Sequence, residues 1–176
     1  MFKIGDYVVV NSNYGICKIE DIAYLDISMA AKDELYYLMI PLEEAGAKIY
    51  IPVGGTKHKI RKVINEEEAW KIIDEVPEIE EMPIDDSRLC EKKYKEAIQS
   101  CEPEILISII KSMYYRMRKR GSQGKKDTVI DERYFKIAEN NLYEELAFAL
   151  GKNKNEMQKL IIDKIKKKNL PSSDRE

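Results

Sequence analysis

The stretch that decides the fold runs from Phe2 to Glu20 and reads FKIGDYVVVNSNYGICKIE. The β-branched run Val8–Val10 and the segment Ile16–Ile19 have the composition of two strands of a small sheet. The polar residues between them end in Gly15 and predict a tight turn, because glycine adopts positive φ angles without a steric cost. The chain is therefore expected to open with a β-hairpin, and further strands must cover it.

More strand patterns follow the hairpin. Residues 22–27 continue it as a strand or irregular edge, 34–40 precede Pro41, 47–53 alternate polar and apolar side chains, and 59–63 form a last short segment. Such short strands, close together in the sequence, fit a strongly bent sheet or barrel and do not fit a parallel βαβ unit.

A helix is predicted directly after the strands. Asn65 is a suitable N-cap, and the acidic residues 66–68 would face the positive end of the helix. Trp70 could be a surface anchor for a partner, but its spacing from Ile73 favours packing in the core. The side chains expected to point inward are Ala69, Trp70, Ile73 and Val76.

The composition changes at residues 77–86, where an acidic segment with two prolines predicts a domain boundary. We therefore assign residues 1–76 to a β domain with a terminal helix and 77–86 to a linker. Beyond it the apolar period becomes 3.6, which predicts a compact all-helical domain over 87–170 and a tail over 171–176. The predicted fold class is α+β, with two domains.

The composition also excludes several functional classes. A chain with 44% hydrophobic and 35% charged residues should be a folded, soluble protein, and without a membrane span or signal sequence we expect it in the cytoplasm. Cys17, Cys90, Cys101 and the single His58 are too few and too scattered for a disulfide framework or a zinc site. No nucleophile, base or phosphate-cradle motif is present, so we predict no enzyme activity, cofactor or small-molecule substrate.

The net charge of −2 hides a strong asymmetry. Residues 1–83 hold 9 basic and 16 acidic side chains, whereas residues 84–176 hold 21 and 16. A basic half suggests a polyanionic partner, and DNA would be bound through phosphate contacts. The alternatives are a solvated charged face, or an adaptor whose helical half binds an acidic protein.

Two basic clusters with nearby tyrosines make up this half. The first lies around Tyr94 on a helix predicted over residues 87–100, and the second runs from the next helix into a glycine-marked loop. The first consists of Arg88, Lys92, Lys93 and Lys95, and the second of Lys111, Tyr114, Tyr115, Arg116, Arg118, Lys119, Arg120, Lys125 and Lys126.

The order of these motifs resembles the CarD/CdnL family of bacterial transcription regulators. In the first half the matching residues are Phe2, Gly5-Asp6, Val8-Val9, Gly15–Ile19, Tyr36-Tyr37, Ile49–Val53, Arg61 and Val63-Ile64. In the second half they are Lys93–Lys95, the 105–117 helix, Ala138–Leu142 and Glu145–Ala147. The resemblance covers about residues 1–150.

The resemblance implies a non-catalytic factor with no cofactor and no membrane partner. Its first domain, shared with the transcription-repair coupling factor, would be a Tudor-like barrel that docks on the RNA polymerase β subunit. Its helical domain would meet promoter DNA at the upstream edge of the melted bubble and stabilise the open complex, which implies a nucleoid-associated protein. Lys92, Lys93 and Lys95 match basic positions of the family's DNA-facing helix, and Arg88, Lys125 and Lys126 extend this predicted DNA-binding set.

Two departures from the family fall on functional positions. Several relatives insert a tryptophan wedge into the minor groove, and the matching position here is Cys90, with Leu89 beside it. In some relatives arginines on the barrel contact polymerase, and the nearest positions here are Leu25 and Tyr50, which predicts a more apolar polymerase contact.

Overall fold

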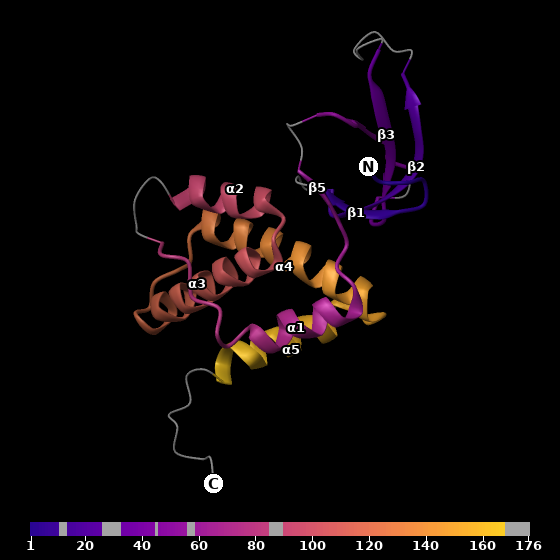
Figure 1. Ribbon diagram of the computed structural model, residues 1–176. Helices are drawn as coiled ribbons and strands as arrows, with labels where there is room; N and C mark the ends of the chain where they lie inside the picture. The colour runs from indigo at the N-terminus through magenta and orange to yellow at the C-terminus, as the bar shows by residue number, and fades with distance from the viewer. Residues whose placement is uncertain (11–13, 26–32, 45, 56–58, 85–89, 168–176) are drawn as a thin grey trace. The chain divides into compact units, whose positions relative to one another are not determined.

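The structure is a computed structural model of residues 1–176 (Figure 1), and it describes all of them except 11–13, 26–32, 45, 56–58, 85–89 and 168–176. The chain divides into two compact units, Met1–Val63 and Ile64–Glu176. The described residues of the first unit form an antiparallel sheet of five strands, and those of the second form five helices. The predicted α+β class is confirmed.

The sheet is built on the predicted hairpin. Its strands are β1 (Tyr7–Val10), β2 (Ile16–Tyr24), β3 (Leu35–Pro41), β4 (Ile49–Pro52) and β5 (Ile60–Lys62), in the spatial order β4-β3-β2-β1-β5. Val8 of β1 lies opposite Cys17 of β2, and Gly15 has a φ angle of 60°, which explains why glycine is needed there. The prediction of a β-hairpin with a positive-φ glycine is therefore confirmed.

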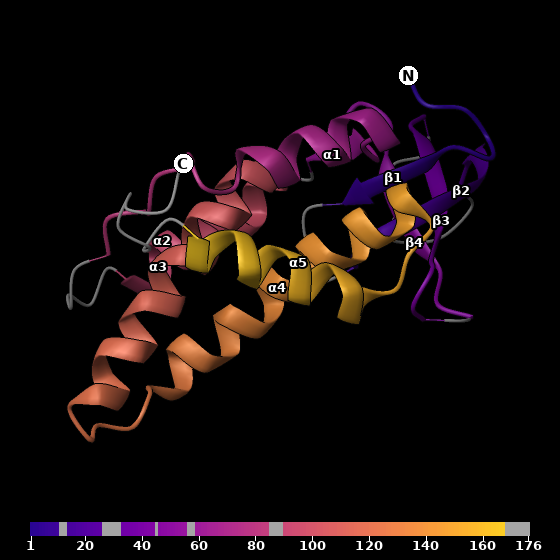
Figure 2. The same cartoon turned by 90° about the horizontal axis from the view of Figure 1, so that it is seen from below.

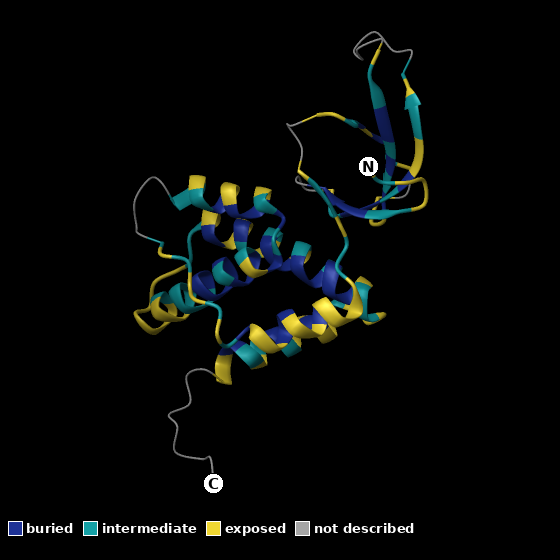
Figure 3. Cartoon of the chain, in the orientation of Figure 1, coloured by how far each residue is buried: buried dark blue, intermediate teal, exposed yellow. Residues whose placement is uncertain are grey.

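One face of the sheet carries the core of the first unit. Alternate residues of β3 and β4 point to this face, as the period of two requires. Its buried side chains are Val8, Val10, Cys17, Ile19, Tyr37, Met39, Ile49 and Ile51. Figure 3 colours the cartoon dark blue where the chain is buried.

The second unit consists of α1 (Glu66–Glu75), α2 (Cys90–Ser100), α3 (Pro103–Ser122), α4 (Val129–Leu150) and α5 (Lys154–Lys167). Local sequence explains where these helices start and stop. Asn65 and Glu68 form a complete capping box on α1, Pro103 is the first residue of α3, and Gly151 ends α4 with a left-handed φ of 61°. The predicted cap at Asn65 is confirmed.

The core of the helical unit lies around the hairpin of α3 and α4 (Figure 2). α5 packs along α4, α2 contacts both helices of the hairpin, and α1 contacts α4 and α5. Leu106, Ile109, Ile110 and Met113 form a buried stripe along α3, and Ile107 is also fully buried.

The structure divides the chain earlier than the sequence predicted. α1 belongs to the helical unit because Ala69, Ile72, Ile73 and Val76 join its core, so the unit begins at Ile64 and not after the predicted 77–86 linker. The prediction for Trp70 was wrong, since its side chain is 40% exposed. The buried residues of α1 follow an i, i+3, i+4, i+7 pattern from Ala69, and Trp70 falls outside that stripe.

The three cysteines are free thiols, with Cys17 and Cys101 buried and Cys90 half-buried. They act as small apolar side chains of the two cores.

Glu139 is a buried carboxyl group inside the helical unit. Its side chain is 9% exposed, accepts a hydrogen bond of 2.9 Å from the Tyr143 hydroxyl, and also interacts with Gln158. Burial raises the pKa of Glu139 above its ordinary value of 4.5, and the two hydrogen bonds offset this only in part. The ionised carboxylate is therefore less favourable in the folded state than in the unfolded chain.

A Glu139→Gln variant is expected to be more stable than the wild type at neutral pH. The pKa of Glu139 is higher in the folded state than in the unfolded chain, so ionisation of Glu139 lowers the free energy of unfolding. This loss develops as pH rises from 4.5 through the folded-state pKa, and it is absent in acid. Urea unfolding at pH 4 and pH 8 measures the difference, which should be present at pH 8 and vanish at pH 4. An equal difference at both pH values would contradict this explanation.

Candidate functional site

On the face of the sheet opposite the core, the part formed by β3 and β4 is also apolar. Tyr36, Leu38 and Ile40 of β3 alternate with the core residues, and Leu38 lies opposite Tyr50 of β4. Tyr36 is buried, Leu38 and Ile40 are half-buried, and Tyr50 is 42% exposed. An antiparallel sheet usually turns a polar face to water, so a second apolar face is typical of a protein-binding surface. We call Tyr36, Leu38, Ile40 and Tyr50 the outer sheet face.

The two predicted polymerase-contact residues do not lie side by side. Tyr50 is in β4, the strand at one end of the sheet. Its partner on β3 is Leu38, and Leu38 pairs in turn with Asp21 of β2. Leu25 follows the last residue of β2 and is half-buried, four residues beyond Asp21. Four residues of extended chain span about 13 Å, and this distance separates Leu25 from the row of paired residues that contains Tyr50. Tyr50 thus belongs to the outer sheet face, and Leu25 lies beyond the end of β2.

The α2 lysines are exposed or half-exposed, and each has a partner. The Nζ atom of Lys92 is 3.8 Å from Glu96, and that of Lys95 is 3.4 Å from Glu91. Lys93 donates a hydrogen bond of 3.0 Å to the Pro83 carbonyl. To bind DNA, these lysines would have to break their present contacts and form new ones with phosphate groups. The cost of breaking the ion pairs is small, because exposed ion pairs are weak.

The second basic cluster gathers at the end of the α3–α4 hairpin. Within the described residues, no acidic partner meets the ammonium groups of Lys119, Lys125 or Lys126, and all three side chains are exposed. Arg120 donates from Nε and Nη2 to the Lys126 carbonyl at 3.1 and 3.0 Å, which ties the loop to α3. Unpaired lysines beside a fixed guanidinium favour contacts with phosphate groups.

Two apolar residues at this end of the hairpin were missed by the sequence reading. Val129 and Ile130 open α4 directly after its N-cap Thr128, and they are 81% and 38% exposed. The sequence contained the signal for Val129, because the residues three and four positions further on, Glu132 and Arg133, are charged, so Val129 does not share the buried face of α4. Exposed apolar side chains flanked by lysines suit a surface that meets nucleic acid bases as well as phosphates.

The predicted wedge position is only partly accessible. Cys90 is the first residue of α2, is half-buried, and packs against the helical core. Leu89 and Arg88 lie outside the described residues.

Lys111 does not belong to the basic surface where the sequence reading placed it. Its side chain is fully buried, and its ammonium group donates to the carbonyls of Val76 at 2.8 Å, Pro77 at 3.3 Å and Ile79. It therefore holds the end of α1 against α3.

A buried polar cluster sets the position of α2. The Tyr94 hydroxyl donates a 2.7 Å hydrogen bond to Asp131 of α4, and Arg116 of α3 donates to the other oxygen of Asp131 at 3.2 Å. Burial, followed by the hydrogen bond to Asp131, raises the pKa of Tyr94 well above its usual value, so the hydroxyl stays a donor. The tyrosine of the Lys-Tyr-Lys motif thus fixes α2 so that its lysines face outward.

The described part of the chain contains no cluster of three or more His, Cys, Asp or Glu side chains that could hold a metal ion. None of its helices is long and apolar enough to cross a membrane.

Comparison with known proteins assigns the first unit. Residues 2–64 match the family model described as CarD-like/TRCF RID domain, and this segment coincides with the sheet unit Met1–Val63. No curated protein matches the chain. Residues 2–64 therefore form a CarD-like/TRCF RID domain, the RNA polymerase-interacting domain of that family.

Proposed function

We propose that this protein is a transcription regulator that binds the RNA polymerase β subunit through its sheet unit and promoter DNA through its helical unit. The observation that carries the proposal is the CarD-like/TRCF RID domain at residues 2–64, with its apolar outer sheet face. By the family resemblance, the sheet unit is a Tudor-like module and the DNA contact lies at the upstream edge of the bubble. Such a factor stabilises the open complex only by its differential affinity for open over closed DNA.

The outer sheet face supports the polymerase contact. Tyr50 is its most exposed member and lies on a terminal strand of the sheet, where a partner can reach both its ring and the strand edge. Aromatic residues in such positions are frequent energetic centres of interfaces.

A Tyr50→Glu variant of the full chain is expected to bind RNA polymerase at least about tenfold more weakly, because it places a charge in an apolar contact. Tyr14→Glu is the matched control, since Tyr14 is 41% exposed in the same unit but lies in the turn between β1 and β2. Titration of labelled protein with purified polymerase measures both. Equal affinities for the two variants would remove the outer sheet face from the interface.

The helical unit supports the DNA contact through Lys92, Lys93, Lys95, Lys125 and Lys126. The loop pair Lys125 and Lys126 is exposed and has no acidic partner among the described residues, whereas the α2 lysines already hold partners. DNA phosphates should therefore gain more from the loop pair than from α2.

A Lys125→Ala/Lys126→Ala variant should bind promoter DNA in the polymerase complex with a shallower salt dependence. Each lost phosphate contact lowers the slope of log affinity against log salt by about 1, so the change is about 2. The matched control is Lys92→Ala/Lys95→Ala, for which we expect a smaller change. An unchanged slope and open-complex lifetime in both variants would favour the adaptor function, in which the helical unit binds an acidic protein.

A further inference from the structure

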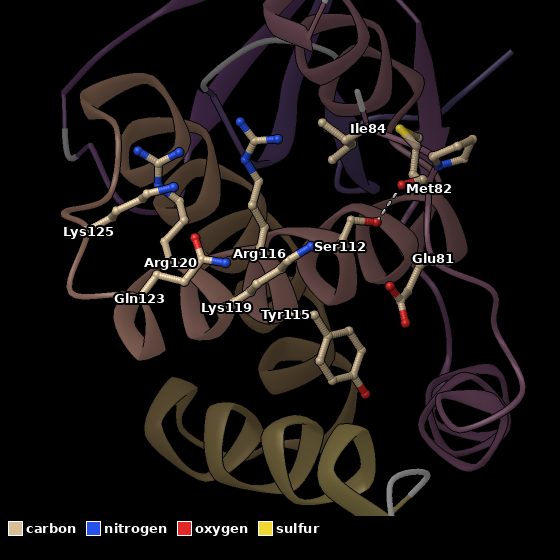
Figure 4. Close-up of a pocket in the computed structure, with 11 residues that line it drawn as sticks. Glu81, Met82, Ile84, Ser112, Tyr115, Arg116, Lys119, Arg120, Gln123 and Lys125 are labelled. Atoms are coloured by element: carbon tan, nitrogen blue, oxygen red, sulfur yellow. Dashed lines mark hydrogen bonds between the residues drawn. The ribbon is translucent and has the colours of Figure 1, made fainter. Parts of the chain in front are cut away.

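The helical unit contains a cavity of about 740 Å³ between α3, the loop after α3 and the segment before α2 (Figure 4). This volume is typical of sites for small molecules. Its walls come from residues 81–84, from α3 and from the loop residues Gln123 and Lys125, all within one compact unit.

The cavity lining is strongly cationic at one end. Arg116, Lys119, Arg120 and Lys125 line it, against one carboxylate, that of Glu81. Asp131 balances Arg116, so Lys119, Arg120 and Lys125 supply the excess positive charge. Figure 4 shows Arg120, Gln123 and Lys125 grouped together. The Arg120 guanidinium is already oriented by its two bonds to the Lys126 carbonyl, which lowers the entropy cost of binding an anion.

The opposite end of the cavity has a different chemistry. Met82, Pro83 and Ile84 form an apolar wall there, and Figure 4 shows Met82 and Ile84 on the side away from Arg120 and Lys125. A methionine thioether packs well on an aromatic ring. The Glu81 carboxylate at this end can accept hydrogen bonds from hydroxyl or amino groups but would repel a phosphate.

We propose that this cavity binds a nucleoside polyphosphate. The phosphates would contact Lys119, Arg120 and Lys125, the base would lie on Met82 and Ile84, and Glu81 would accept a hydrogen bond from the sugar or base. A bare polyphosphate would leave the apolar wall unused and would meet Glu81. A DNA duplex keeps its bases stacked away from that wall. The inference does not depend on the DNA-binding function.

Titration calorimetry of the full chain with ATP, GTP, inorganic triphosphate and adenosine, without divalent cations, tests the proposal. We expect binding of at least one nucleotide, tighter than that of triphosphate or adenosine. Lys119→Ala/Lys125→Ala should weaken nucleotide binding about tenfold or more, whereas Lys92→Ala, outside the cavity, should leave it unchanged.

Glu81→Ala provides the most specific outcome, and Glu81 is exposed, so folding should persist. The variant should bind the nucleotide more weakly and triphosphate more tightly than the wild type. The proposal is overturned if no nucleotide binds, if triphosphate binds as tightly as the nucleotide, or if Lys92→Ala weakens binding as much as the cavity variant. Tighter binding of single-stranded DNA than of either nucleotide would overturn it in favour of a polynucleotide site.

Discussion

A Lys111→Met variant is expected to lose about 3 kcal/mol of the free energy of unfolding, although lysine is usually a surface residue and methionine has a similar length. Lys111 is fully buried in α3, and its three ammonium protons match the carbonyls of Val76, Pro77 and Ile79. Methionine has no N–H group to donate, so these buried or partly buried carbonyl oxygens would lose a hydrogen bond.

The reason for this lysine lies at the end of α1. A helix ends with carbonyl groups that have no partner within the helix, and its C-terminus attracts positive charge. The last turn of α1 contains no basic residue, so α3 supplies the cation through Lys111. The same contacts fasten the chain that leaves α1, and they help to keep α1 in the helical unit.

Urea unfolding followed by fluorescence is a sensitive measurement for this variant, because the only tryptophan, Trp70, lies on α1. In Lys111→Met, the tryptophan signal should change at lower urea than the helical circular dichroism signal. Lys119→Met, an exposed position two turns further along α3, is the matched control and should stay within about 0.5 kcal/mol of the wild type. Equal stabilities of the two variants would contradict the role of Lys111.

Lys111 also shows where sequence reasoning stops. Turn and cap chemistry at Gly15, Asn65 and Gly151 was predictable because it depends on neighbours within a few residues. The partners of Lys111 lie more than 30 residues away, so its charge alone placed it on the basic surface. Burial of a charged side chain is decided by tertiary contacts that its local pattern does not contain.

The candidate functional sites were also predictable from the sequence only in part. The motif order around Gly15 and Tyr36-Tyr37 predicted the CarD-like/TRCF RID domain that residues 2–64 match. The apolar outer sheet face was not predicted beyond Tyr50, because it requires the pairing of Leu38 with Tyr50 across two strands. The α2 lysines were predicted from charge, but their partners Glu91, Glu96 and the Pro83 carbonyl emerge only when the helix and the preceding segment are placed.

An Asp131→Ala variant is expected to lose about 4 kcal/mol of unfolding free energy, because it removes one partner from a buried ionic cluster. Asp131 is 1% exposed and binds the Tyr94 hydroxyl and the Arg116 side chain through its two carboxylate oxygens. Its loss leaves the arginine charge and the tyrosine hydroxyl without this acceptor. Urea unfolding measured by circular dichroism gives the free energy.

Two further variants separate the contacts of Asp131. Asp131→Asn keeps an acceptor for Tyr94 but loses the charge that faces Arg116, so its loss should be smaller than that of alanine. Tyr94→Phe removes only the hydroxyl and should cost about 2 kcal/mol, the value of a hydrogen bond to a charged group. Combined with Asp131→Ala, Tyr94→Phe should add little, because the interaction is already lost.

The cluster also links stability to the proposed DNA contact. Tyr94 lies between Lys93 and Lys95, so a loosened α2 would lower DNA affinity although every lysine remains. Asp131→Asn, assayed at a temperature where it is folded, should therefore bind promoter DNA more weakly in the polymerase complex, with its affinity for polymerase alone unchanged. Asp163→Ala, which removes an exposed aspartate of α5, is the control for both measurements. A loss below about 1 kcal/mol for Asp131→Ala would show that α2 is held mainly by its apolar contacts, Ala97 and Ile98.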